Sequence, residues 1–221
     1  GFPFSEQLVI REKKIMQGTA DAALYALEYG VGMNTAGGTH HAFSFKGEGF
    51  CLFNDIAIAA NLLLNKKLVA KILVVDLDVH QGNGTAEIFS KDNRVFTFSM
   101  HAKHNYPFHK EQSDLDVELH DGITDEAYLA LLDYHIEYLM DTVVPDFAFF
   151  QSGVDIIAGD KLGKLNVSIE GCRRRDEKVL TSCYRHHVPV CISMGGGYSQ
   201  QIRDIVEAHA NTFRLAQYLY F

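Results

Sequence analysis

Short apolar runs alternate with longer amphipathic segments along the chain. The apolar runs predict buried strands at 31–34, 72–75, 94–100, 146–150 and 189–194. The amphipathic segments have apolar residues at helical spacing and predict helices at 5–29, 56–65, 85–90, 124–142, 168–186 and 199–218. Strands that are apolar throughout and alternate with helices indicate a mainly parallel sheet covered on both faces, and hence a three-layer α/β/α fold.

Residues 101–123 depart from this pattern. They are polar, with several histidines and an acidic cluster at Asp114, Asp116 and Glu118. We expect them to form one long loop, and loops of that length in compact domains are usually functional or disordered.

Chemically unusual residues lie just past the carboxyl end of each predicted strand. They are His40-His41, Asp76 with Asp78 and His80, Ser99-Met100-His101, Gln151–Asp155 and Gly195–Tyr198. In open α/β sheets this edge is where ligands bind. We therefore expect segments far apart in the sequence to converge on one cleft.

The segment Asp76–His80 suggests a metal site. Its two carboxylates and one imidazole occupy alternate positions, and alternate side chains of an extended segment share a face. Like charges at the end of a buried strand are costly unless a cation holds them, although a strand that ends in solvent can also carry them. Asp78, His80 and Asp155 form a set of three ligands, which is typical of a catalytic zinc with an open position. Such an oxygen-rich set also tolerates Fe(II).

The candidate proton carriers are His40 and His41. An adjacent pair of histidines is either a chance surface pair or a pair of acid–base groups beside the metal. We expect Asp76 to orient one imidazole and Asn83 to hold the other. Tyr198, which follows three glycines, either caps the next helix or donates a hydrogen bond to a substrate oxyanion.

Composition restricts the class of protein. The chain has 221 residues and a net charge of −8, which argues against non-specific binding of nucleic acid or of an anionic membrane surface. The basic run Arg173–Arg175 is expected to be a solvated helix face. No apolar stretch approaches the roughly 20 residues of a membrane span, and the N-terminus lacks a signal-peptide pattern. Four cysteines without CxxC spacing fit buried thiols in a reducing compartment, so we expect a cytoplasmic protein.

Taken in order, several segments resemble the zinc-dependent histone deacetylase family of the arginase/deacetylase superfamily. They are Gly37–Ala42, Gly49–Asp55, Asp76–Gly84, Gly153–Asp155 with Ala158–Asp160, and Gly196–Tyr198. Asn83 and the loop at 105–108 are most similar to the bacterial or class IV-like branch. The resemblance implies an arginase/deacetylase-like fold and a hydrolase that deacetylates acetyl-lysine in proteins or a small acetylated amine.

The resemblance also implies a role for each matching catalytic residue. Zn(II) would be bound by Asp78, His80 and Asp155. His41 would act as general base and then general acid. His40, paired with Asp76, would be its electrostatic helper, and Tyr198 would stabilise the oxyanion.

Substrate and cation sites follow from the same resemblance. Phe50 and Tyr106 would form opposite walls of the acyl-lysine tunnel, and Gly49, Gly196 and Gly197 would adjoin the substrate. An inner site for a monovalent cation such as K⁺ would comprise Asp76, Asp78, His80, Ser99 and Met100. An outer site would comprise Phe89, Asp92, Val95 and Tyr128.

Two features depart from the family pattern. Asn83 replaces the Asp that some members place beside the second histidine, so His41 should be less basic. Family members also have a further stretch before the equivalent of Gly1, and we expect residues 1–221 to be a single deacetylase domain that lacks this N-terminal segment.

Three other functions are considered. A catalytically silent module would keep the pocket and bind acyl-lysine or a hydroxamate without turnover. An acetylpolyamine amidohydrolase fits the same residues, and the acidic balance of the chain favours cationic substrates. An arginase-like dimanganese hydrolase is disfavoured because bridging two metals requires more carboxylates than these segments contain.

Overall fold

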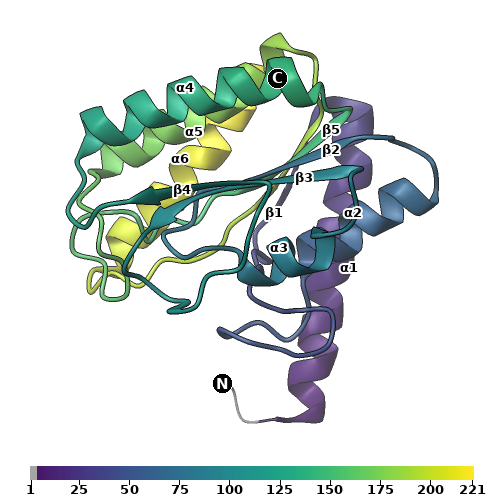
Figure 1. The fold of residues 1–221 in the computed structure, drawn as a ribbon, viewed down its shortest axis with the longest axis horizontal. Coiled ribbons are helices and arrows are strands. Elements are labelled where there is room, and N and C mark those ends of the chain that lie inside the picture. The colour runs from purple at the N-terminus through teal and green to yellow at the C-terminus, as the bar shows by residue number, and fades with distance from the viewer. Residues whose placement is uncertain (1–3) are drawn as a thin grey trace.

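The computed structural model describes residues 4–221, and within them six strands form one sheet (Figure 1). Its order is β1-β6-β5-β2-β3-β4, and every neighbouring pair is parallel. The strands are β1 (Val31–Asn34), β2 (Ile72–Asp76), β3 (Val95–Ala102), β4 (Leu115–Leu119), β5 (Phe147–Gln151) and β6 (Val190–Ser193). The helices are α1 (Glu6–Tyr29), α2 (Asp55–Asn65), α3 (Asn83–Phe89), α4 (Asp125–Val143), α5 (Ile169–Arg185) and α6 (Ile202–Tyr220).

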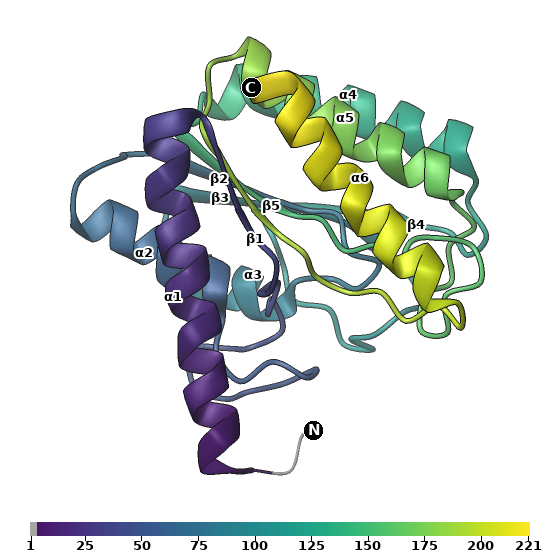
Figure 2. The ribbon, with the colours of Figure 1, turned by 180° about the vertical axis from the view of Figure 1, so that it is seen from behind.

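Helices cover both faces of the sheet, as Figures 1 and 2 show. The helices α1, α2 and α3 lie on one face, and α4, α5 and α6 lie on the other. The central strand β2 is buried along its whole length, and its side chains alternate between the two layers. Ile72 and Val74 pack with α1 and α2, whereas Leu73 and Val75 pack with α4 to α6. The predicted three-layer fold with a parallel sheet is confirmed.

Local signals fix where the helices begin. Ser5, Asn54 and Ser168 each accept a hydrogen bond from a backbone N–H in the first turn of the helix that follows. Asn54 is the cap of α2, and Asp55 is the first residue of that helix. Helix α1 ends at Gly30, whose φ of 84° is in the left-handed region that glycine tolerates. None of the helices in residues 4–221 has the length and apolar character needed to span a lipid bilayer.

The prediction of one long loop at 101–123 is wrong. Residues 115–119 form β4, which pairs in parallel with β3 at the edge of the sheet. Leu115, Val117 and Leu119 alternate with Asp116 and Glu118, and this alternation is the pattern of a half-buried edge strand. Glu118 is exposed, whereas Asp116 is half-buried and accepts hydrogen bonds from Gln81 and from the Ser113 N–H.

The prediction of a solvated face at Arg173–Arg175 is wrong for Arg175. Its side chain is fully buried, whereas Arg174 is exposed. The guanidinium donates to the carbonyl oxygens of Leu77, Ser152 and Gly153 and pairs with Asp176 at 2.6 Å. A buried cation with that many acceptors organises backbone that would otherwise be unpaired. The four cysteines, in contrast, are free and buried as expected.

Candidate active site

Side chains from the carboxyl ends of β2 and β5 form the candidate metal site. These strands are neighbours in the middle of the sheet, with Asp76 opposite Gln151. Asp78 and His80 follow β2, and Asp155 follows β5. His80 Nδ1 lies 3.0 Å from Asp78 Oδ1 and 3.2 Å from Asp155 Oδ2, and one potential ligand atom from each residue lies within 4.8 Å of the other two.

The donor set fits a divalent cation. All three side chains are buried, and two carboxylates without a cation beside them would be costly there. Burial raises the pKa of Asp155 to about 7, and the charge of Asp78 adds to this effect. Burial opposes protonation of His80, but its hydrogen bonds with Asp155 and Asp78 outweigh this and raise its pKa to about 10. A cluster that retains a proton so strongly is one in which a metal ion can replace that proton.

Backbone groups hold the carboxylates in place. The Val79 N–H donates to Asp155 Oδ1 at 2.9 Å, and the Gly196 N–H donates to Asp78 Oδ2 at 2.9 Å. A Cβ added at Gly196 would meet Asp155 Oδ2 at 2.0 Å, so only glycine allows this approach. Gly196 therefore backs the metal cluster. Gly197 lies farther back, against Val154 and α6.

His40 and His41 are buried beside this cluster and are not a surface pair. Their ring centroids are 4.1 Å apart, and His40 Nε2 is 3.9 Å from Asp78 Oδ1. His40 Nδ1 is hydrogen-bonded to Asp76 Oδ2 at 2.7 Å, and His41 Nδ1 to Asn83 Oδ1 at 2.7 Å. Asp76 and Asn83, the residues expected to hold the two imidazoles, are therefore their hydrogen-bond partners in the structure.

The two imidazoles have opposite electrostatic environments. Burial opposes the charge on His40, but Asp76 and Asp78 outweigh it and raise its pKa to about 9. Burial lowers the pKa of His41 far below its usual value, and the charge of His40 lowers it further. At neutral pH this favours a cationic His40 next to a neutral His41 that can accept a proton.

The sequence gives no signal for Glu48, which connects Asn83 to the tunnel wall. Asn83 Nδ2 donates to Glu48 Oε1 at 3.1 Å, and the hydroxyl of Tyr106 donates to the same oxygen at 2.6 Å. Glu48 stands between two glycines, a position typical of an exposed turn, and its partners Asn83 and Tyr106 are distant in the sequence. Only the folded structure reveals this contact.

A cavity of about 590 Å³ gives access to these residues. The rings of His41 and Tyr106 are edge-to-face with their centroids 5.0 Å apart, and the ring centroids of Phe50 and Tyr198 are 6.5 Å apart. The lining residues are His41, Gly49, Phe50, His80, His104, Asn105, Tyr106, Phe108, Lys161, Leu162, Lys164 and Tyr198. Gly49 lies against the His41 ring, where an added Cβ would come within 2.5 Å of a ring carbon. The cavity is thus walled by the predicted aromatic residues and closed by the histidines.

The residues predicted for an inner cation site lie together behind the metal cluster. Asp76 pairs with Ser99 across β2 and β3, and Asp76, Ser99 and Met100 are all buried. The predicted outer site is wrong as a set. Phe89 and Val95 pack in the layer with α2, whereas Tyr128 of α4 is buried in the layer on the opposite face of the sheet.

Asn54 and Asp55 anchor the loop that carries the histidines. Asp55 accepts hydrogen bonds from the backbone N–H groups of Gly38 and Thr39 and from hydroxyls of α1 and β6. Asn54 Nδ2 donates to the Ala42 carbonyl at 3.2 Å, while its Oδ1 caps α2. The sequence assigns neither residue to the anchoring of this loop, although both stand in the Gly49–Asp55 segment.

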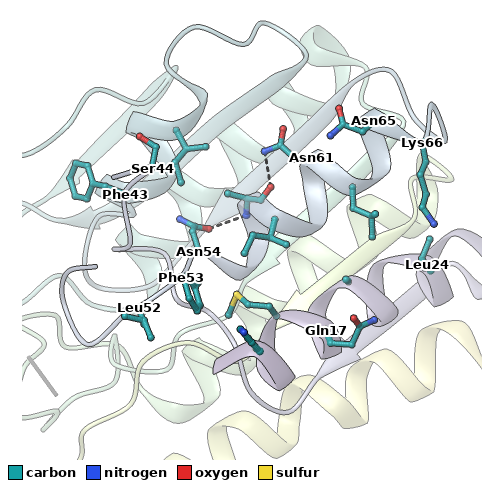
Figure 3. A pocket seen from close by; sticks show the side chains of 17 residues that line it. Gln17, Leu24, Phe43, Ser44, Leu52, Phe53, Asn54, Asn61, Asn65 and Lys66 are labelled. Carbon is teal, nitrogen blue, oxygen red and sulfur yellow. Dashed lines mark hydrogen bonds between the residues drawn. The ribbon is translucent and has the colours of Figure 1, made fainter. Parts of the chain in front are cut away.

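A second hollow, larger than the first cavity, is shown in Figure 3. It has a volume of about 930 Å³ and lies between α1, α2 and residues 43–54. Phe43, Leu52 and Phe53 face it, and Asn61 on α2 is bonded to the Ala57 carbonyl. Within residues 4–221 the one group of His, Cys, Asp and Glu side chains that could hold a metal ion is Asp78, His80 and Asp155, and His80 lines the first cavity. We therefore place the chemistry in the smaller cavity.

Comparison with known proteins agrees with this geometry. Residues 2–213 match the sequence profile of the histone deacetylase domain. The chain belongs to the histone deacetylase family. Within that family it is 32% identical over 208 residues to Histone deacetylase 2 of Arabidopsis thaliana and 35% identical over 180 residues to Histone deacetylase clr6 of Schizosaccharomyces pombe. An uncharacterized protein of Picosynechococcus sp. is 47% identical over 220 residues.

A solved member shares the fold. The crystal structure of the HDA15 HD domain superposes with a TM-score of 0.76 at 27% identity, and the match covers 90% of this chain and 61% of that one. The present chain covers 73% of the length of the Picosynechococcus protein, 54% of Histone deacetylase 2 and 43% of clr6. It thus spans only part of the length of these relatives.

Proposed function

We propose that this chain is a metal-dependent deacetylase that hydrolyses the acetyl amide of acetyl-lysine or of a small acetylated amine. The observation that carries the proposal is that His80, one member of the buried Asp78, His80 and Asp155 cluster, lines the same cavity as His41 and Tyr198. Family membership supports the reaction class. The identity of the metal, the roles of the residues and the substrate are our proposals.

Asp78, His80 and Asp155 would hold Zn(II), and the same oxygen-rich set would accept Fe(II). When bound, zinc polarises a carbonyl and lowers the pKa of water. His80 would bind through Nδ1, because this nitrogen faces both carboxylates. Asp76, Ser99 and Met100 would hold K⁺ beneath the cluster, where it would offset the gathered negative charge.

His41 would remove a proton from water during attack on the acetyl carbonyl and later give a proton to the leaving amine. Its burial and its cationic neighbour His40 keep it neutral, as a base must be before it takes up a proton. His40, held by Asp76, would keep its positive charge and stabilise the negative charge that develops during attack.

Tyr198 would donate its hydroxyl hydrogen to the carbonyl oxygen of the substrate. Burial and the charges of Asp78 and Asp155 raise the pKa of Tyr198, so the phenol remains a donor over the whole neutral range. Phe50 and Tyr106 would pack on the two sides of the methylene chain of acetyl-lysine, since both line the cavity. These aromatic walls would exclude water from the methylene chain of the substrate.

Metal depletion tests the proposal. Chelation should abolish hydrolysis of an acetyl-lysine reporter, and Zn(II) should restore it. If the zinc-loaded protein binds a hydroxamate by calorimetry but cleaves neither acetyl-lysine peptides nor acetylated diamines, it is a silent binding module. Elemental analysis that finds two divalent metal ions per chain would contradict the assignment of a single catalytic metal site.

A further inference from the structure

We infer that Glu48 is a positioning residue that fixes the tautomer of His41 through the side chain of Asn83. The inference rests on the proposed role of His41 as a base. It concerns a residue that neither touches the metal cluster nor lines the cavity. It also gives a physical reason why a neutral Asn83 can serve where an aspartate would be expected.

Hydrogen-bond donors surround the carboxylate of Glu48. Its Oε1 faces the amide nitrogen of Asn83 at 3.1 Å and the hydroxyl of Tyr106 at 2.6 Å, and Lys46 pairs with its other oxygen. Hydrogen bonds from Lys46 and Tyr106 lower the pKa of Glu48, which keeps it ionised. An ionised carboxylate accepts hydrogen bonds and donates none. Asn83 must therefore turn its NH₂ group toward Glu48.

The amide of Asn83 carries its NH₂ group and its oxygen on opposite ends. With its NH₂ group on Glu48, Asn83 presents Oδ1 to His41 Nδ1 at 2.7 Å. An amide oxygen only accepts, so the hydrogen of the neutral imidazole must be on Nδ1. Nε2 then keeps its lone pair and is the nitrogen that can take up a proton. A general base needs this tautomer.

Glu48 prevents the opposite orientation of the Asn83 amide. The two ends of an amide group have nearly the same shape, so an unrestrained Asn83 could present NH₂ to His41. His41 Nδ1 would then have to accept, and the hydrogen would move to Nε2. That tautomer cannot act as a base. Asn83 is almost fully buried, so water does not restore the lost orientation.

The central variant is Glu48→Met, which keeps the length of the side chain and removes the acceptor. We expect kcat on acetyl-lysine to fall on the order of tenfold, with a much smaller change in KM. The direct readout is the ¹⁵N spectrum of histidine-labelled protein at neutral pH. In the parent protein the ¹⁵N shifts of His41 should show hydrogen on Nδ1, and in the variant they should move toward the other tautomer. Because Glu48 is partly exposed on a loop, the fold should persist, and Glu48→Gln provides a milder second variant.

Tyr106→Phe is the matched control. It removes the other hydrogen bond to Glu48 Oε1 but leaves the contact between Glu48 and Asn83. The His41 spectrum should stay that of the parent in this variant, whatever happens to KM. A His41 spectrum that shifts equally in Tyr106→Phe and Glu48→Met would overturn the inference, because the loop as a whole would then be responsible.

A double variant makes the test decisive. Asn83→Asp alone puts a second carboxylate against Glu48, and repulsion between like charges should disturb His41. In the Glu48→Met background the same aspartate becomes the acceptor for His41 Nδ1 and should restore both the Nδ1-protonated spectrum and kcat. If the double variant is no better than Glu48→Met, Glu48 does not act through Asn83. The spectrum can be read whether or not the chain is a deacetylase, so failure of the inference and failure of the proposed function are distinguishable.

Discussion

Arg175 donates a hydrogen bond of 2.7 Å from Nη1 to the carbonyl oxygen of Gly153. The same Nη1 donates to the carbonyl of Leu77 at 3.1 Å. Leu77 directly precedes Asp78, and Gly153 lies two residues before Asp155. One buried cation therefore joins the two strand ends that carry the candidate metal ligands. Its charge is balanced by Asp176, which Thr212 on α6 also contacts at 2.7 Å.

Arg175→Met should destabilise the protein strongly. The variant leaves Asp176 buried without its partner, and breaking a buried pair in this way costs about 3–5 kcal/mol. The free energy of unfolding in urea measures the effect. Arg174→Met is the control, because this exposed neighbour should change stability by only about 0.5 kcal/mol. Equal effects of the two variants would show that the buried contacts of Arg175 are unimportant.

Tyr198→Phe should lower kcat for acetyl-lysine hydrolysis by about 10²- to 10³-fold, the usual effect of losing one oxyanion donor. The hydroxyl is not one of the three candidate ligands, so zinc affinity should stay unchanged. Steady-state kinetics and competition with a chromogenic chelator measure the two quantities. A variant with parental kcat would remove Tyr198 from the reaction.

Asn105→Leu should weaken metal binding about 10- to 100-fold. A metal on His80 Nδ1 requires the ring hydrogen to be on Nε2, and the amide nitrogen of Asn105 lies 3.4 Å from Nε2. The amide oxygen of Asn105 is buried and has no partner among the described residues, and an amide turned end for end would present this oxygen to that hydrogen. Chelator competition gives the affinity. Asn65→Leu, an exposed substitution on α2, is the matched control and should leave the affinity at its parental value.

His209 should make the protein less stable in mild acid. Burial lowers its pKa to about 4, and the charge of Arg175 contributes. Below about pH 6.5 the unfolded chain takes up a proton at this residue that the folded chain refuses. Stability should therefore fall as the pH drops from about 6.5 to about 4, by as much as about 3 kcal/mol, and level off below that.

Unfolding free energies of His209→Asn across this pH range test that prediction. The variant should show a shallower loss of stability on acidification than the parent, whatever its absolute stability. His120→Asn, at an exposed histidine, should keep the parental slope. A parental slope in His209→Asn would assign the acid sensitivity to other groups.

The mouth of the cavity should disfavour cationic substrates, despite the net charge of −8. The lining includes Lys161 and Lys164 and no carboxylate. The double variant Lys161→Glu with Lys164→Glu should raise the ratio of kcat/KM for acetylated diamines to kcat/KM for acetyl-lysine flanked by acidic residues. The expected gain is about twofold to fivefold per charge at low salt. The gain should shrink as ionic strength rises. Lys14→Glu on α1, outside the cavity, should leave the ratio unchanged.

Apolar periodicity predicts the central strands because strands buried on both faces are apolar throughout. It misses β4, because Asp116 and Glu118 stand between Leu115, Val117 and Leu119 and give the segment the composition of a loop. The edge of the sheet is thus harder to predict than its centre, since one half of an edge strand has the composition of a loop.

The metal set is predictable because Asp78 and His80 are close in sequence and Asp155 follows another buried strand. Glu48 and Arg175 are not predictable in this way. Glu48 acts on partners that only folding brings near, and the partners of Arg175 include backbone carbonyls, which every residue has. A basic triplet on a helix has the same composition whether one of its members points inward or none does.

Asp78 and Asp155 follow different strands, so both could hold one cation only after β2 and β5 have paired. An unfolded chain offers no comparable chelate, and metal binding then adds directly to the free energy of the native state. The midpoint of thermal melting should consequently climb with the concentration of free zinc. A simple melting curve would report how fully a preparation is loaded.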